Sequence, residues 1–197
     1  PGQENEMIIN DGTGAGSVAK VTRDNRLATE AVTRGASSQA AKAGKAYVVS
    51  TSGTVAPNAT GGVMLFLRND SQTESVLIDQ VTISADSTKL VALEYVSHTV
   101  GTLSDKTDTR AVSLNTQYSE NRLITACFWD GSNNGIGGLS GDPLVVGAST
   151  LSTTPLTIDH DGDLIIGPGK NYAVHLDNNS GGAQNAAVTV KFFMEAV

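Results

Sequence analysis

The sequence lacks the residues on which several protein classes depend. Its 197 residues include one cysteine, Cys127, one tryptophan and only 17% charged side chains. A single cysteine cannot form an intramolecular disulfide, and it excludes a Cys-based zinc site. Aromatic residues make up 5% of the chain, which leaves few rings for stacking on sugars. Stability must therefore come from packing or from assembly.

Long apolar runs and an overall positive charge are also absent. No stretch approaches the roughly 18 apolar residues that a membrane span needs. Residues 1–4 show neither the basic nor the apolar region of a secretory signal. The net charge of −7 argues against nucleic-acid binding, which usually needs a basic surface. We therefore expect a soluble protein that binds neither nucleic acid nor membrane.

The charge is distributed unevenly along the chain. Residues 1–14 sum to −3, residues 15–46 to +4 and residues 47–197 to −8. Residues 1–46 also contain few large apolar side chains and no sustained period, apart from a weak helix signal over 37–43 that ends at Gly44. These features predict an extended N-terminal arm over 1–46 and a folded body over 47–197. A partly disordered leader is the alternative for the first segment.

From residue 47 onward, signals for β-strands recur every 10 to 20 residues. In 171–177 and in 187–194, large apolar residues alternate with small or polar ones, so each segment predicts a strand with one buried face. The segments 167–169 and 178–182 have the composition of tight turns. The pattern predicts an all-β, antiparallel β-sandwich, with a jelly roll favoured and an immunoglobulin-like sandwich as the alternative.

The strongest candidate for a metal site is the acidic segment Asp159-His160-Asp161-Gly162-Asp163. Its three carboxylates at alternate positions resemble the start of a calcium loop. An EF-hand, however, needs glycine at its sixth position and glutamate at its twelfth, where this chain has Leu164 and Lys170. We therefore predict an Asp-Gly hairpin turn between two strands and no metal, with Asp159, Asp161 and Asp163 as weak candidates.

Candidate catalytic residues are equally scarce. The histidines His98, His160 and His175 lack the i, i+4 spacing of a helical metal site. His175 lies between two apolar strand residues, so we expect an exposed or hydrogen-bonded side chain rather than a ligand. The glycine-rich segment 130–141 has no phosphate-binding lysine, and no Gly-x-Ser-x-Gly elbow occurs. We predict no catalytic residue, no cofactor and no enzymatic activity, and a long 130–141 loop suited to contact with a partner.

Two parts of the chain resemble virion proteins. Segments 8–14, 19–21 and 25–27 read IINDGTG, AKV and NRL, and they resemble the N-terminal region of virion proteins of tailed bacteriophages. Segments 164–169 and 172–176 read LIIGPG and YAVHL, and they are similar to jelly-roll strands of viral structural and decoration proteins. The resemblance covers roughly residues 8–34 and 163–194.

This resemblance implies a capsid decoration, or cement, protein on the outer surface of a virion. Such a protein is non-enzymatic and often trimeric, and its partners are the major capsid protein and further copies of itself. Under this reading the capsid or subunit contacts are made by the basic residues of the arm, namely Lys20, Arg23, Arg26 and Arg34. The alternatives are a head fibre, spike or tail-associated host-binding protein, a carbohydrate-binding module and, with least support, an enzyme.

Overall fold

The computed structural model describes residues 20–21, 27–28, 36–58, 62–103, 111–115, 117, 124–128 and 136–196. The chain divides into two units, residues 1–34 and residues 35–197. In the first unit, β1 (Lys20–Val21) pairs antiparallel with β2 (Leu27–Ala28). None of the helices in the described segments has the length and apolar character of a membrane span.

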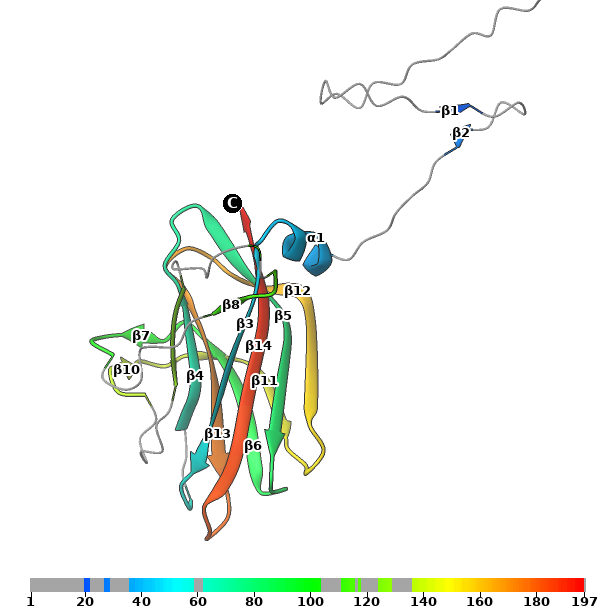
Figure 1. Cartoon of the computed structure of the whole chain (residues 1–197). Helices are drawn as coiled ribbons and strands as arrows, with labels where there is room; N and C mark the ends of the chain where they lie inside the picture. The colour runs from blue at the N-terminus through cyan, green and yellow to red at the C-terminus, as the bar shows by residue number, and fades with distance from the viewer. Residues whose placement is uncertain are drawn as a thin grey trace, which may run out of the picture. The chain divides into compact units, whose positions relative to one another are not determined.

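The second unit consists of two antiparallel five-stranded sheets that pack face to face (Figure 1). The first sheet has the order β12-β5-β14-β3-β8, and the second has the order β11-β6-β13-β4-β9. A short pair, β7 with β10, lies beside the second sheet. The elements are α1 (Ala36–Lys42), β3 (Ala46–Val55), β4 (Gly62–Asn69), β5 (Glu74–Ala85), β6 (Leu90–Val96), β7 (Thr99–Val100), β8 (Val112–Ser113), β9 (Ile124–Phe128), β10 (Leu139–Ser140), β11 (Leu144–Thr150), β12 (Leu156–Ile166), β13 (Asn171–Asn178) and β14 (Gln184–Ala196).

The strand pairing is that of a jelly roll. Strands β3, β4, β5 and β6 pair with β14, β13, β12 and β11 in turn, so the chain forms one long hairpin of strand pairs. This hairpin is folded over so that successive pairs fall in opposite sheets, and β8 and β9 extend one sheet each. The predicted antiparallel β-sandwich is confirmed, and its strand order is that of a jelly roll rather than of an immunoglobulin domain.

The inner faces of the two sheets form the main hydrophobic core. Its largest fully buried side chains include Tyr172, Phe192 and Leu65, and the Tyr47 ring stacks on Phe192 with centroids 5.7 Å apart. Strand β14 alternates between buried and partly exposed positions through its first half, as predicted. Strand β13 was expected to bury one face, yet six successive residues are buried, because its outer face is also covered.

A second, smaller apolar cluster covers the outer face of β4 and β13. Val63, Phe66 and Ala173 lie on these strands, and Ile136 packs on them together with Leu139 of β10. The segment that contains β10 therefore acts as a cover over the centre of the sheet. This cover explains why β4 and β13 carry apolar residues at consecutive positions rather than at alternate ones.

Residues 36–46 belong to the body, which places the boundary near Gly35 rather than at residue 46. The helix predicted over 37–43 is confirmed as α1, and Gly44 ends it with a positive φ of 71°. Ala40 and Ala46 pack against Leu77 and Phe193. The first unit therefore loses Lys42 and Lys45, and residues 1–34 carry four basic and five acidic side chains, a net charge of −1. That residues 1–34 form an extended arm stays a prediction.

The Asp159-Gly162 segment is a bulge inside one strand, which corrects the predicted hairpin turn between two strands. Residues 156–159 and 164–166 both pair with β5, with a register shift between Asp159 and Leu164. Because both halves follow the same partner, the additional residues loop out and the chain does not reverse. Asp161 and Gly162 adopt positive φ values of 51° and 86°, and a Cβ at Gly162 would lie 2.9 Å from Cζ of Phe193.

Candidate functional site

Two histidines that are 77 residues apart in sequence meet on the outer face of the second sheet. The Nε2 atoms of His98 and His175 lie 2.8 Å apart, and both residues are buried. The ring planes are 6° apart and the centroids 4.9 Å apart. The rings therefore meet edge to edge through their nitrogens, and one ring donates an N–H to the other. Burial lowers the pKa of His98, which favours the uncharged form of that ring.

The backbone around His98 is held by a buried asparagine. The His98 N–H donates to Oδ1 of Asn171 at 2.8 Å, and Nδ2 of Asn171 donates to the His98 carbonyl at 2.9 Å. The preceding Ser97 has a φ of 66°, which is costly for a residue with a side chain. Tyr95 of β6 lies against His175, with ring centroids 4.3 Å apart. These contacts with Asn171 and Tyr95 therefore hold the imidazole pair in place.

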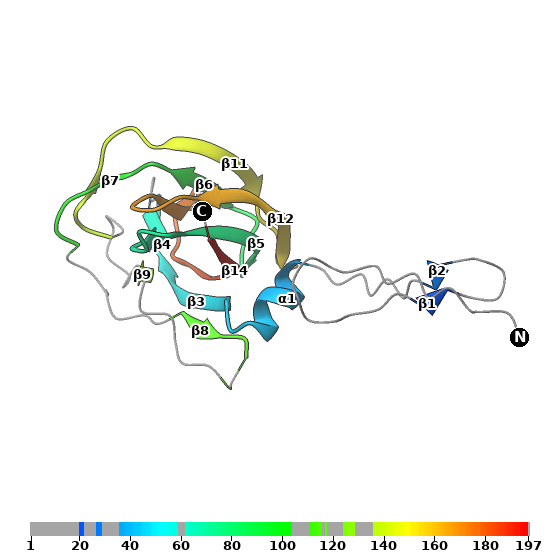
Figure 2. The ribbon, with the colours of Figure 1, turned by 90° about the horizontal axis from the view of Figure 1, so that it is seen from above.

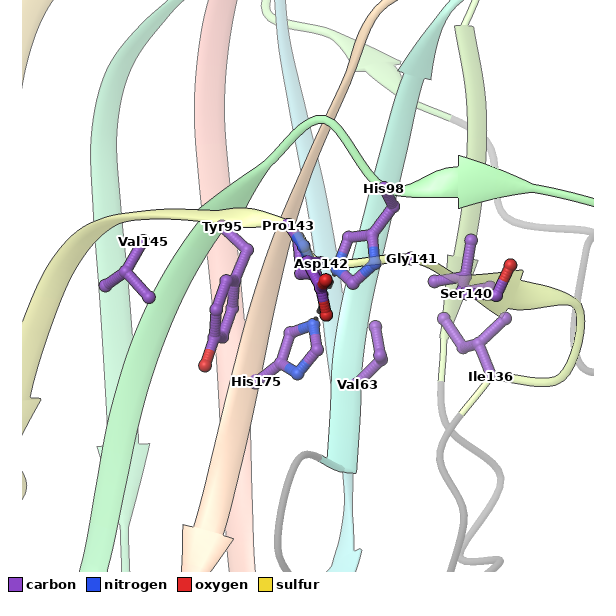
Figure 3. A pocket seen from close by; sticks show the side chains of 11 residues that line it. Val63, Tyr95, His98, Ile136, Ser140, Gly141, Asp142, Pro143, Val145 and His175 are labelled. Atoms are coloured by element: carbon purple, nitrogen blue, oxygen red, sulfur yellow. Dashed lines mark hydrogen bonds between the residues drawn. The ribbon is translucent and has the colours of Figure 1, made fainter.

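An open cavity of about 490 Å³ lies beside the imidazole pair. Figure 3 shows the segment around Gly141 to Val145 crossing in front of β6, β13 and β4, with Asp142 projecting in front of the two histidines. The cavity lies between this segment and the outer face of the sheet. Its lining residues are Val63, Tyr95, His98, Ile136, Leu139, Ser140, Gly141, Asp142, Pro143, Val145 and His175.

The predicted metal candidates do not gather into a site. Asp159, Asp161 and Asp163 are all exposed, and Oδ1 of Asp159 accepts a hydrogen bond from Gln80 at 2.7 Å. Within the described segments no group of three or more His, Cys, Asp or Glu side chains is placed to hold a metal ion. The His98–His175 pair leaves no room for an ion either, because the two nitrogens point at each other.

The third histidine takes part in a buried network that joins the two sheets. Oε1 of Glu94 on β6 accepts hydrogen bonds from Nε2 of His160 on β12, at 2.8 Å, and from the hydroxyl of Tyr172 on β13. Burial, with the adjacent Glu94 carboxylate, raises the pKa of Tyr172 well above its usual value. A Cβ at Gly147 would lie 2.5 Å from Oε2 of Glu94, so β11 is fitted closely to the network. This network lies within the sandwich and connects its layers.

Exposed apolar side chains gather at two edges of the sandwich. The β11 patch consists of Leu144, Val145 and Val146, which are 64%, 55% and 44% exposed. The β8 patch consists of Val112 and Leu114, which are 52% and 42% exposed. Strands β11 and β8 are the end strands of their sheets, and Figure 2 shows them on opposite sides of the sandwich. Patches of this kind on a folded protein often mark contact surfaces.

The structure describes only some of the other residues that the sequence analysis named. Lys20 is part of β1, while its side chain and the residues Arg23, Arg26 and Arg34 lie outside the described residues. Of the 130–141 loop, residues 130–135 lie outside them too, whereas Ile136 and residues 139–141 line the cavity. Cys127 lies on β9 and pairs with Phe66 of β4.

Comparison with known proteins shows no family for this chain. No family model matches the chain, and no curated protein matches it. A structure of infectious bursal disease virus, Gt strain, is 14% identical, with 78% of this chain and 42% of that chain covered and a TM-score of 0.19. The corresponding values for the Gx strain are 12%, 77%, 40% and 0.18. The chain thus spans about two fifths of these proteins, and such TM-scores carry no argument about function.

Proposed function

We propose that the protein is a non-enzymatic structural protein of a virus particle that assembles with copies of itself and decorates the outer surface of a bacteriophage capsid. The observation that carries the proposal is the pair of exposed apolar patches at opposite edges of a jelly-roll body. The N-terminal resemblance to virion proteins supports the choice of particle. The fold alone supports none of this, because jelly rolls serve many functions.

The β11 patch has the properties of a contact surface. An exposed edge strand presents unpaired backbone groups, and proteins usually protect such an edge with charged residues or proline. Strand β11 reads LVVGAST and contains neither. Its first three side chains are large, apolar and exposed. An edge of this kind is stable in solution when another strand or surface covers it.

Two different patches on opposite sides favour head-to-tail contacts between subunits. In a two-fold dimer the same patch of each copy meets its equivalent, which would leave the second patch uncovered. If the β11 patch of one copy meets the β8 patch of the next, every copy covers both patches, and a closed ring forms when the rotation between neighbouring copies closes. A trimer is such a ring, in agreement with the oligomer that the resemblance implies.

The N-terminal unit supplies the proposed contact with the major capsid protein. Lys20, Arg23, Arg26 and Arg34 would meet acidic groups on the capsid or on a neighbouring subunit. The charge of residues 1–34 is balanced overall, so the contact would depend on these positions rather than on net charge. Several such units in one oligomer raise the overall affinity without strong individual contacts.

Cysteine crosslinking tests the head-to-tail contact. Val112→Cys and Val145→Cys are made separately in a Cys127→Ser background, mixed and oxidised. We expect disulfide-linked pairs of the two different variants and few or none within either variant alone. Crosslinks between two copies of the Val145→Cys variant would show a two-fold contact and contradict the ring, while a strictly monomeric protein would contradict the assembly proposal itself.

Deletion of residues 1–34 tests the contact with the particle. Residues 35–197 form a compact unit, so we expect the shortened protein to fold and to keep its oligomeric state. It should lose cosedimentation with capsids of the virus that encodes it, which the full chain should retain. Undiminished binding by the shortened protein would overturn the role of the N-terminal unit.

A head fibre, spike or tail-associated host-binding protein is the second candidate function. One observation favours it, because part of the 130–141 loop lines an open cavity. A carbohydrate-binding module shares this feature. Binding of the full chain to a glycan array or to host cells, without binding to capsids, would favour these functions over decoration.

A further inference from the structure

We propose that the cavity beside the His98–His175 pair is a binding site for a small organic cation. The inference does not depend on the proposed role in a virus particle. A volume of about 490 Å³ lies in the range of small-molecule sites, roughly 300–1,000 Å³. The site would accept a compact ammonium group that carries methyl or methylene groups.

The wall of the cavity contains buried polar groups and a backbone conformation that are energetically costly for the fold. Two buried imidazoles share one hydrogen bond, and the buried side chain of Asn171 makes two more to the backbone of His98. The residue before His98 has a left-handed backbone. Conformations of this kind persist where the surrounding structure holds them, and they concentrate at functional positions. The rings therefore form a preorganised surface rather than a mobile one.

The charge of the lining selects against anions. Asp142 supplies one carboxylate, and none of the described residues that line the cavity is a lysine or an arginine. Burial lowers the pKa of His98, which favours the uncharged form of that ring. A negatively charged ligand would meet only negative charge, whereas a cation gains a direct attraction to Asp142.

The remaining lining suits the apolar part of such a cation. Tyr95 and the two imidazoles contribute three rings, and Val63, Ile136, Leu139 and Val145 contribute aliphatic surface. Aromatic rings attract organic ammonium groups through their electron-rich faces, and methyl groups on nitrogen find apolar contacts. A bare metal ion is a poor fit, because the described residues hold no cluster of three ligands.

Titration of the full chain with choline tests the site, with 3,3-dimethylbutan-1-ol as the uncharged analogue of the same shape and glucose as a neutral sugar. Chemical shifts of the imidazole nitrogens report binding next to His98 and His175. We expect choline to bind about tenfold more tightly than its neutral analogue, from one favourable charge interaction. Equal binding of the two, tighter binding of glucose or no binding of choline would overturn the proposal.

Two variants show whether Asp142 carries the selectivity. Asp142→Asn should reduce choline binding to the level of the neutral analogue. The matched control is Asp163→Asn, because Asp163 is an exposed carboxylate on β12 that does not line the cavity, and it should leave binding unchanged. Because Asp142 is exposed, its replacement should leave the fold intact. Full choline binding by the Asp142→Asn variant would contradict the proposal.

Acid should weaken choline binding. Among the described residues, the groups that face the imidazole pair are Asp142 from the crossing segment, Tyr95 from β6 and Asn171 from β13, and Asp142 is the carboxylate among them. Protonation of a histidine adds a positive charge that competes with choline for Asp142. Affinity should therefore fall as the pH drops from about 6.5 toward the lowered pKa of His98. In a His98→Gln, His175→Gln double variant, the pH dependence of choline binding should disappear. If it persists, it does not arise from these two histidines.

Discussion

Strands β4 and β11 lie in the same sheet and have similar apolar content, but their surroundings are opposite. Strand β4 reads GVMLFLRN and is buried at nearly every position, whereas β11 reads LVVGAST and is exposed at most positions. The two strands differ in what covers their faces. Strand β4 has the first sheet on one face and the β10 segment on the other, while β11 ends its sheet. Apolar residues at the centre therefore stabilise the fold, and those at the edge are available for contact.

The largest expected effect comes from the same substitution made in both regions. Leu65→Ala, at a fully buried position on β4, should lower the free energy of unfolding by about 2–5 kcal/mol. Leu144→Ala, at an exposed position on β11, should change it by less than about 0.5 kcal/mol. Urea denaturation at low protein concentration, where assembly contributes least, measures both. Equal losses would show that β11 is part of the folding core.

A smaller effect is expected where the two sheets are joined by a buried network. Tyr172→Phe removes a hydroxyl that donates to the buried carboxylate of Glu94 and should cost about 1–3 kcal/mol, because a buried acceptor loses a donor. A double-mutant cycle with His160→Gln shows whether the two donors act together. Full additivity in this cycle would contradict a shared network, since both side chains donate to the same oxygen.

The stability of the folded body should fall in acid. Burial lowers the pKa of His98, so the folded protein binds fewer protons at this site than the unfolded chain. The resulting stability is fully present above the unfolded pKa of about 6.5, and it is lost as the pH falls toward the lower pKa of the folded state. Urea midpoints measured from pH 8 down to about pH 5 test this. The His98→Gln variant should show a shallower decline, and an equally steep one would refute the assignment to His98.

The smallest effect is expected at the surface of the body. Nζ of Lys45 lies 2.6 Å from Oε1 of Glu74, and this hydrogen bond raises the pKa of Lys45. Because the lysine side chain is 45% exposed, solvent screens the pair, and Lys45→Met should cost less than about 1 kcal/mol. Thermal unfolding at low and high salt measures the contribution. A loss as large as that of Leu65→Ala would mean that Lys45 anchors α1 more strongly than its exposure implies.

Local sequence signals predicted the elements that depend on neighbouring residues. The alternation of β14, the helix ended by Gly44 and the turn at 178–182 each follow from side chains close in sequence. In that turn the Ser180 N–H donates to Oδ1 of Asn178, and Nδ2 of Asn178 donates to the Gly182 carbonyl. Each of these signals is complete within a few residues, which is why it can be recognised without a structure.

Features that depend on distant residues were missed. The bulge at Asp161 and Gly162 arises because both halves of β12 follow β5, which no local signal shows. The alternation in β13 correctly placed His175 on the outer face, but the residue that meets it, His98, is 77 positions away. The burial of that face depends on Ile136 and Leu139, which come from a glycine-rich segment predicted as a surface loop. Only the fold brings these residues together.

The mass of the full chain in solution tests the central claim most directly, because the exposed β11 and β8 patches should be covered by neighbouring copies. Light scattering after gel filtration should show one closed oligomer with a mass three times the 20.3 kDa of the chain. The Val145→Glu and Leu114→Glu variants should each lower the mass to that of the monomer. A full chain that stays monomeric at the highest accessible concentration would contradict the account.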